Sequence, residues 1–230
     1  MFVRCIGTGS QQGNCYALYD NDGKILLLDL GLARKEILKG IDFNVSDVVG
    51  AVVSHGHGDH AKSVKDFENM GVKVWKPYHE TNLTDRMKFG GFSVQCFPLP
   101  HNGVANFGFY INVDGQKTLY LTDYEYCRFN FKSLQVNHII CECNYQQELV
   151  SRDLANYEHK IRGHCSLETC KSFIDANKTN AIRTVILCHM GVETTIAEEC
   201  LSEVQNVVGD CVKCVCAAAG ETVELSLYPF

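Results

Sequence analysis

Residues 48–60 read VVGAVVSHGHGDH, an apolar run that leads directly into a histidine-rich loop. The apolar run predicts a buried strand over Val48–Ser54. Four side chains that can bind a metal follow it within six residues: His55, His57, Asp59 and His60. Imidazole suits zinc, iron, nickel and manganese, and carboxylate suits harder ions. The intervening glycines let the loop bend sharply, so this spacing favours a metal site over a merely solvated histidine loop.

Three further candidate ligands follow apolar strands elsewhere in the chain. His101 follows a strand that ends in FPLP, Asp123 follows TLYLT, and His189 follows VILC. Each of them alone has a simpler interpretation, as an exposed histidine at a strand end or an aspartate in a turn. Their common position, together with the histidine loop, favours a shared rim at which all of them bind metal.

Length and composition limit the class of protein. The chain has 230 residues, of which 46% are hydrophobic and 21% charged, and it shows no repeat or linker. We therefore expect one globular domain spanning residues 1–230. The net charge of −6 argues against broad, charge-driven binding to a nucleic-acid backbone, although it leaves a local basic groove open. The apolar runs are too short to cross a bilayer and the N-terminus lacks a signal-peptide pattern, so we expect a cytoplasmic protein without a membrane partner.

Thirteen cysteines are many for this length. Their odd number and scattered spacing argue against a disulfide framework, so reduced thiols are the better interpretation. Cys211, Cys214 and Cys216 resemble half of a structural zinc site. Buried thiols on a strand explain them more simply, and the sequence leaves both interpretations open.

The hydrophobic pattern predicts an α/β protein with much antiparallel sheet. The expected strands are Val3–Ile6, Cys15–Tyr19, Ile25–Asp29, Val48–Ser54, Val72–Trp75, Phe92–Phe97, Phe107–Val113, Thr118–Thr122, His138–Glu142, Thr184–Leu187, Val212–Ala217 and Thr222–Leu227. The expected helices are Leu32–Lys39, about His60–Met70, around Gln146–Lys160, Leu167–Asn177 with Ser166 as its N-cap, and one opened by a capping box at Thr195–Glu198.

These motifs resemble the metallo-β-lactamase fold superfamily along nearly the whole chain. Asp29, the histidine loop, His101, Asp123 and His189 stand in that family's order. The resemblance implies a four-layer αββα sandwich and two divalent metal ions. It implies one metal on His55, His57 and His101, a second on Asp59, His60 and His189, and Asp123 bridging them. Asp29 would orient the loop. Zinc is the first expectation, and manganese, iron, cobalt or nickel fit the same ligands.

The C-terminal third resembles the phosphodiesterase branch of that superfamily. This branch includes transfer-RNA 3′ processing enzymes of the RNase Z type, YycJ/WalJ-like exonucleases and phage anti-Pycsar cyclic-nucleotide phosphodiesterases. The resemblance implies that Glu142 orients His164 and that His164 either protonates the leaving oxygen or steadies the phosphate. We therefore expect Asp59, Glu142 and His164 to be catalytic. The simpler alternative is a surface carboxylate and a histidine that merely starts a helix. The resemblance, and the frequency of symmetric dimers, also suggest a homodimer.

Substrate contacts are the least determined part of the prediction. Ser10, Asn144, Tyr145 and Arg162 are candidates, and Lys160 could also reach a phosphate. Tyr124, Tyr126 and Tyr145 follow active-site residues and could stack on a base, with core packing as the even alternative. No glycine- and proline-rich arm of the transfer-RNA processing type is visible.

The sequence thus predicts a dinuclear metal-dependent phosphodiesterase. Its substrate would be either a cyclic mononucleotide or a single-stranded nucleic acid. A thioester or lactone hydrolase of the same fold is one alternative, and a non-catalytic nucleotide-sequestering protein is the other.

Overall fold

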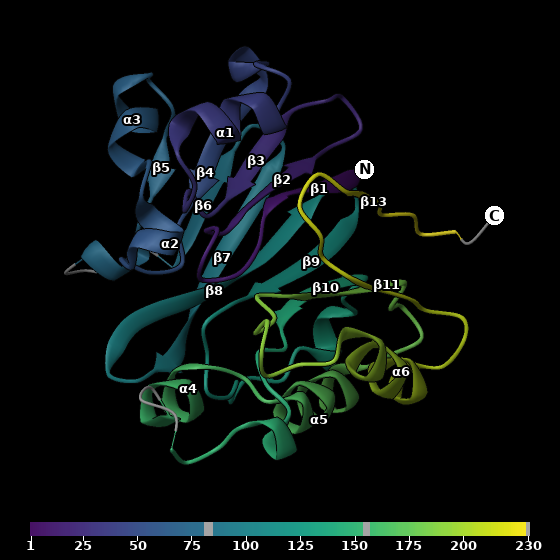
Figure 1. The fold of residues 1–230 in the computed structure, drawn as a ribbon. Coiled ribbons are helices and arrows are strands. Elements are labelled where there is room, and N and C mark those ends of the chain that lie inside the picture. The colour runs from purple at the N-terminus through teal and green to yellow at the C-terminus, as the bar shows by residue number, and fades with distance from the viewer. Residues whose placement is uncertain (81–84, 154–156, 229–230) are drawn as a thin grey trace.

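A computed structural model describes residues 1–80, 85–153 and 157–228. Two sheets pack face to face, and helices cover the outer face of each (Figure 1). Helices α1 (Arg34–Gly40), α2 (Gly58–Ala61) and α3 (Val64–Asn69) lie outside one sheet, and α4 (Tyr157–Gly163), α5 (Leu167–Asn177) and α6 (Ala197–Val208) lie outside the other. The predicted αββα sandwich is confirmed.

The first sheet has the strand order β13-β1-β2-β3-β4-β5. Its strands are β1 (Phe2–Gly7), β2 (Cys15–Tyr19), β3 (Ile25–Leu28), β4 (Val48–Val52), β5 (Val74–Trp75) and β13 (Thr222–Glu224). The β2–β3 hairpin turns at Asp22 and Gly23, and Gly23 has a φ of +78°. From β3 to β5 the pairing is parallel, so β3 and β4 end at the same edge.

The second sheet has the strand order β12-β11-β10-β9-β8-β7-β6. Its strands are β6 (Arg86–Phe89), β7 (Phe92–His101), β8 (Val104–Val113), β9 (Gln116–Leu121), β10 (His138–Glu142), β11 (Thr184–Cys188) and β12 (Lys213–Cys216). Strands β9 to β12 are parallel, so the carboxyl ends of β9, β10 and β11 also share one edge. Strand β6, which is short and polar, was missed by the sequence pattern.

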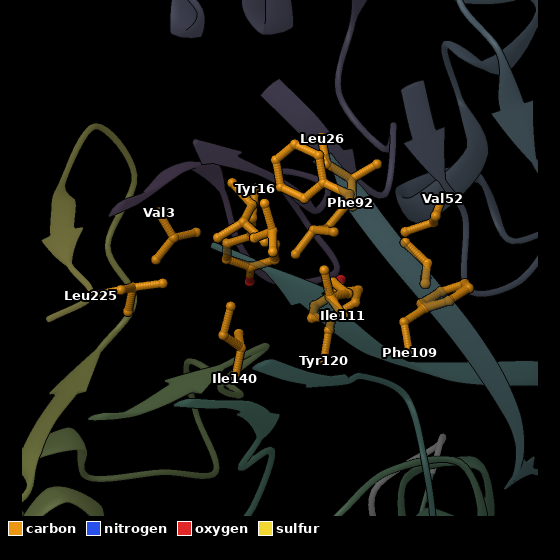
Figure 2. Packing of buried hydrophobic residues seen from close by; sticks show 14 of the residues in the cluster. Val3, Tyr16, Leu26, Val52, Phe92, Phe109, Ile111, Tyr120, Ile140 and Leu225 are labelled. Carbon is orange, nitrogen blue, oxygen red and sulfur yellow. The ribbon is translucent and has the colours of Figure 1, made fainter. Parts of the chain in front are cut away.

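Three apolar clusters hold the four layers together. The central cluster lies between the sheets, where Tyr16, Leu26, Phe109 and Ile140 point toward one another (Figure 2). A second cluster packs α5 and α6 against the second sheet, and a third packs α1 and α3 against the first. Every residue of β2, β3, β10 and β11 is buried, which explains why these strands read as continuous apolar runs.

Two of the expected helices differ in the structure. The helix expected around Gln146–Lys160 is wrong in its first part: residues 147–149 form a single 3₁₀ turn, whereas Tyr157–Lys160 belong to α4, and residues 154–156 lie outside the described residues. Gln146 is buried, its side chain accepts a hydrogen bond from the backbone N–H of Ile196 (2.6 Å), and its own backbone N–H bonds Thr194, so the chain here is held in an extended course. The helix expected at about His60–Met70 is divided into α2 and α3.

Helix starts were predicted with mixed success. The Ser166 side chain accepts a hydrogen bond from the N–H of Thr169 (3.1 Å), so the N-cap of α5 is confirmed. The capping box at Thr195–Glu198 is wrong, because the Thr195 hydroxyl donates back to the carbonyl of Gly191 (2.8 Å) and Ile196 is the N-cap of α6.

None of the helices among the described residues is both long and apolar enough to span a bilayer.

The buried His138 on β10 generates a prediction about acid stability. Burial lowers its pKa to about 3, and its Nε2 donates to Gln116 (2.7 Å). Because the unfolded histidine binds a proton near pH 6.5 and the folded one only near pH 3, stability should fall as the pH drops through this window. His138→Gln should make that loss shallower, by up to about 1.4 kcal/mol per pH unit. Denaturant titrations between pH 7 and pH 4 measure it.

The exposed His79→Gln is the matched control, since it removes an imidazole without altering the core. Identical pH slopes for wild type and His138→Gln would contradict the prediction.

Candidate metal centre

The predicted metal ligands come together at the edge where the carboxyl ends of the parallel strands meet. His55, His57, Asp59 and His60 follow β4, and Asp123 and His189 follow β9 and β11. His101 is the last residue of β7. The two sheets therefore contribute to one site, because each presents the ends of its strands at the same rim.

Four of these residues form the first group. Nε2 of His55 lies 3.0 Å from Nδ1 of His57, which lies 3.3 Å from Nε2 of His101. Asp123 Oδ2 lies 3.6 Å from His55 Nε2 and 3.8 Å from His101 Nε2. Tetrahedral ligands about 2.1 Å from a cation stand about 3.4 Å apart. The four atoms could therefore hold one divalent cation with little movement.

The second group shares Asp123. Nε2 of His60 lies 3.4 Å from Asp123 Oδ1 and 3.5 Å from Asp59 Oδ2. Nε2 of His189 lies 3.7 Å from the same Asp59 oxygen. Because the two groups use different oxygens of Asp123, this carboxylate could bridge two cations. All seven predicted ligands thus lie where a two-metal centre needs them.

Hydrogen bonds fix the orientation of four of the five histidines. Nδ1 of His60 bonds Asp29 (2.7 Å), Nδ1 of His101 bonds the carbonyl of Gly163 (2.6 Å), and Nδ1 of His189 bonds Glu142 (2.7 Å). Nδ1 of His55 lies 3.0 Å from the Ser54 hydroxyl. Each bond leaves Nε2 to face the cluster, as metal-binding histidines require.

Sequence reasoning found Asp29 but missed its two partners. Asp29 is fully buried and accepts the Tyr120 hydroxyl (2.6 Å) and both the backbone N–H (2.7 Å) and the hydroxyl (3.1 Å) of Ser54. Tyr120 belongs to the other sheet, so no spacing in the sequence could have shown it. Together these bonds hold Asp29 in place to orient His60.

Backbone strain marks three of these positions. Asp29, Asp123 and His189 have φ values of +60°, +51° and +49°, in the left-handed region that non-glycine residues rarely adopt. Each directly follows a strand or lies one residue beyond it, so the strain turns the side chain back over the rim. Strain of this kind concentrates at functional sites.

Glu142 connects the cluster to His164. It is fully buried, and one oxygen accepts Nδ1–H of His164 (2.8 Å) and Nδ1–H of His189 (2.7 Å). The other oxygen accepts the backbone N–H groups of Tyr124 (3.1 Å) and Cys165 (3.0 Å). The interpretation of Glu142 as a surface carboxylate is therefore wrong. Ligand atoms of Asp123, Glu142, His164 and His189 lie within 4.8 Å of one another.

The electrostatics of the cluster favour cations. Burial opposes the charge of Asp123, yet His189 and His60 hold the pKa of this carboxyl well below its ordinary value. Burial likewise opposes a charge on His189, but Asp123, Asp59 and Glu142 outweigh it and raise the pKa of His189 to about 10. Burial lowers the pKa of His55. The carboxylates are therefore ionised, and a divalent cation could take the place of the proton that His189 holds when no metal is bound.

The predicted substrate residues divide between two cavities. A cavity of about 430 Å³ opens beside His164, and Ser10, Asn144 and Lys160 line it. Ser10 Oγ lies 3.3 Å from His189 Nε2. Arg162 lines a different cavity, next to His101. His159 also lines the first cavity, with its ring 5.4 Å from that of His164, and sequence reasoning missed it.

Two of the three tyrosines expected to stack on a base do not fit that role. Tyr124 and Tyr145 are 0% and 6% exposed, so their rings pack in the interior. Tyr126 is 51% exposed, and stacking on it stays a prediction.

The cysteines form no metal site within residues 1–80, 85–153 and 157–228, because no three cysteine sulfurs there gather closely enough. Cys214 and Cys216 are partly buried against the second sheet's helices, in line with the simpler interpretation, whereas Cys211 is exposed and not a buried thiol.

Comparison with known proteins identifies the family. The metallo-beta-lactamase superfamily matches residues 8–126. The chain belongs to this superfamily. The exodeoxyribonuclease YycJ of Bacillus anthracis is 22% identical over 217 residues, covering 81% of this chain and 82% of YycJ. Family and fold together make this metallo-beta-lactamase superfamily member a metal-dependent hydrolase.

Solved structures share the fold at low identity. YhfI of Bacillus subtilis is 15% identical with a TM-score of 0.69, covering 96% of this chain and 98% of YhfI. The short form of human tRNase Z is 14% identical with a TM-score of 0.62, covering 98% and 100%. A diphosphatase of the PhnP family is 12% identical with a TM-score of 0.66, covering 98% of each chain.

Tyr120→Phe tests the buried network behind His60. The substitution removes one hydroxyl from Asp29 and preserves the ring, so His60 should be held less firmly. We expect affinity for one of the two divalent ions to fall roughly tenfold, the lower end of the range for such outer partners. Titration with zinc against a competing chelator, with metal counting, measures it. Tyr110→Phe on the adjacent strand β8 is the control. Equal zinc affinity of the two variants would show that the Tyr120 hydroxyl does not support metal binding.

Proposed function

We propose that this chain is a dinuclear metal-dependent phosphodiesterase that hydrolyses a P–O bond of a nucleotide or nucleic-acid substrate. The observation that carries the proposal is the pair formed by the buried Glu142 and His164 beside the metal-binding groups. Hydrolysis of a lactone or thioester has no special need for such a pair. An alkoxide leaving from phosphorus needs a proton, which a histidine oriented by a carboxylate can supply near neutral pH.

We assign His55, His57 and His101 to one metal and Asp59, His60 and His189 to the other, with Asp123 between them. When bound, two divalent cations neutralise charge on the phosphate oxygens and lower the pKa of water. Asp29 and Ser54 fix the histidine loop. The same ligands could bind zinc, manganese, iron, cobalt or nickel ions.

His164 has the geometry of a proton donor. Its Nδ1–H is engaged by Glu142, and its Nε2 has no hydrogen-bond partner among the described residues while the side chain lines the cavity. Glu142 stabilises the positive charge of a protonated His164 and fixes the ring. Nε2–H can then donate to the leaving oxygen of a substrate that occupies the cavity.

The names of related proteins support this class of reaction. The YycJ relative is an exodeoxyribonuclease, and the structural relatives include tRNase Z and a PhnP-family diphosphatase. Each of these names concerns a phosphorus–oxygen bond. The absence of a long arm in this sequence and its net charge of −6 favour a small or single-stranded substrate over folded RNA.

His164→Asn separates acid catalysis from metal binding. Turnover of a dinucleotide, whose leaving alkoxide needs a proton, should fall roughly 100-fold or more. Turnover of bis(p-nitrophenyl) phosphate should change little, because nitrophenolate leaves without a proton. Steady-state rates on both substrates measure the difference, and metal counting confirms an intact centre.

An equal loss of turnover on both substrates would show that His164 does not act as the general acid. A protein loaded in turn with zinc, manganese, iron, cobalt and nickel that hydrolyses no phosphodiester would overturn the proposed function. Activity on thioesters or lactones that survives His164→Asn would support the alternative hydrolase.

A further inference from the structure

A positively charged side chain that the proposed chemistry does not use, that of Lys160, lines the cavity beside His164. Two loops line this cavity, residues 8–12 and 190–194, together with Asn144, His159, Lys160 and His164. Lys160 belongs to α4, one turn before His164, so its ammonium and the imidazole face the same space.

The ammonium of Lys160 is partly satisfied and lacks a counter-ion. Nζ donates to the side-chain oxygen of Asn144 (2.8 Å) and to the Thr194 hydroxyl (3.1 Å). Across the described ranges, no carboxylate lies within 4.0 Å of it, whereas Lys76, Lys171 and Lys178 each pair with an acid. An ammonium has three N–H donors, so one remains for a ligand. Half-burial of a charge is costly; the carboxylates of Glu142 and Glu193 offset part of that cost from beyond ion-pair distance, and a bound anion would offset more of it.

Lys160 is linked to the proposed metal centre through the side chain of Asn144. The same Asn144 side chain that accepts from Lys160 donates through Nδ2 to the carbonyl of His189 (2.8 Å). One amide group therefore separates the ammonium from a proposed metal ligand. The position next to His164 places Lys160 on the side of the leaving group rather than at the scissile phosphate.

The loop of residues 8–12 also offers hydrogen-bond donors to this cavity. Ser10, Gln11 and Gln12 are exposed residues of its lining, and their backbone N–H groups donate to no other group in the parts of the chain that the structure describes. Glu193, the acid that lines this cavity, is exposed and outside ion-pair distance of Lys160. The lining of the cavity thus favours an anion beside Lys160.

We propose that Lys160 binds a second phosphate, the one next to the scissile phosphate on the leaving-group side of a linear strand. This inference rests on the proposed function and names its substrate class. A cyclic mononucleotide has a single phosphate, which the metal centre would occupy, so it would leave Lys160 without a partner. A linear oligonucleotide supplies a phosphate at each linkage and fills both positions.

The experiment uses thymidine dinucleotides with a methylene group in place of the bridging oxygen, so that they bind without being cleaved. One carries no terminal phosphate, one a 5′-phosphate and one a 3′-phosphate. Calorimetry measures their binding to the metal-loaded protein. We expect one terminal phosphate to strengthen binding about tenfold or more, as a charge-assisted hydrogen bond would.

Three variants assign that gain to Lys160. Lys160→Met should abolish it, and Lys160→Arg should retain most of it because the charge remains. Lys35→Met on α1 removes an equal charge from an exposed site away from the cavity and should leave the gain unchanged. Thermal unfolding and metal counting show whether the Lys160→Met protein keeps its fold and its metals.

The possible outcomes separate the second-phosphate site from the proposed phosphodiesterase activity. If the unmodified dinucleotide is cleaved but neither terminal phosphate improves binding, or if Lys160→Met keeps the improvement, the second-phosphate site is wrong while the phosphodiesterase stands. Cleavage of cyclic mononucleotides as efficient as that of phosphorylated dinucleotides would also overturn it. If no dinucleotide binds, and neither a dinucleotide nor a cyclic mononucleotide is cleaved, both proposals fail.

Discussion

The structure depends on the concentration of negative charge at the meeting edge of its two sheets. Asp29, Asp123 and Glu142 are almost completely buried there, and Asp59 lies beside them. A buried carboxylate is tolerated only when hydrogen bonds and positive charge surround it. Imidazoles, backbone N–H groups and the hydroxyls of Ser54, Tyr120 and Thr122 supply the hydrogen bonds, and the remaining charge suits divalent cations. The sandwich is the scaffold that brings these groups together.

Parallel strand ends explain why so much of the site was predictable. A strand with a continuous apolar run is recognisable in the sequence, and the residue after it lies at the rim of the sheet. Asp123 and His189 were found in this way, and His101 was found at the end of the antiparallel strand β7. Ser54 and Tyr120 were not, because their roles arise from contacts with Asp29 that sequence spacing does not show, Ser54 from the neighbouring strand and Tyr120 from the other sheet. A tyrosine within an apolar strand looks like a core residue whether or not its hydroxyl reaches a carboxylate.

The periphery was harder to predict for a geometric reason. Lys160 and Arg162 are two residues apart on α4, which turns the chain by about 200° over that interval. One therefore lines the cavity with His164 and the other lines a cavity beside His101. The sequence shows two cations close to a histidine and gives no sign that they diverge. The prediction that Tyr145 contacts substrate had the same weakness, because its position after Glu142 did not reveal that its ring is buried.

Glu142 is the residue whose role is hardest to isolate by substitution. Its two oxygens accept four N–H groups, two from histidines and two from the backbone. A glutamine at this position would have one acceptor oxygen, so two of those donors would face its NH₂ group whichever way it turned. The orientation of His189 would suffer together with that of His164. Loss of the carboxylate would therefore mix metal binding with the proposed proton transfer, whereas substitution of His164, whose Nε2 has no hydrogen-bond partner in the described part of the chain, would test the proposed proton transfer by itself.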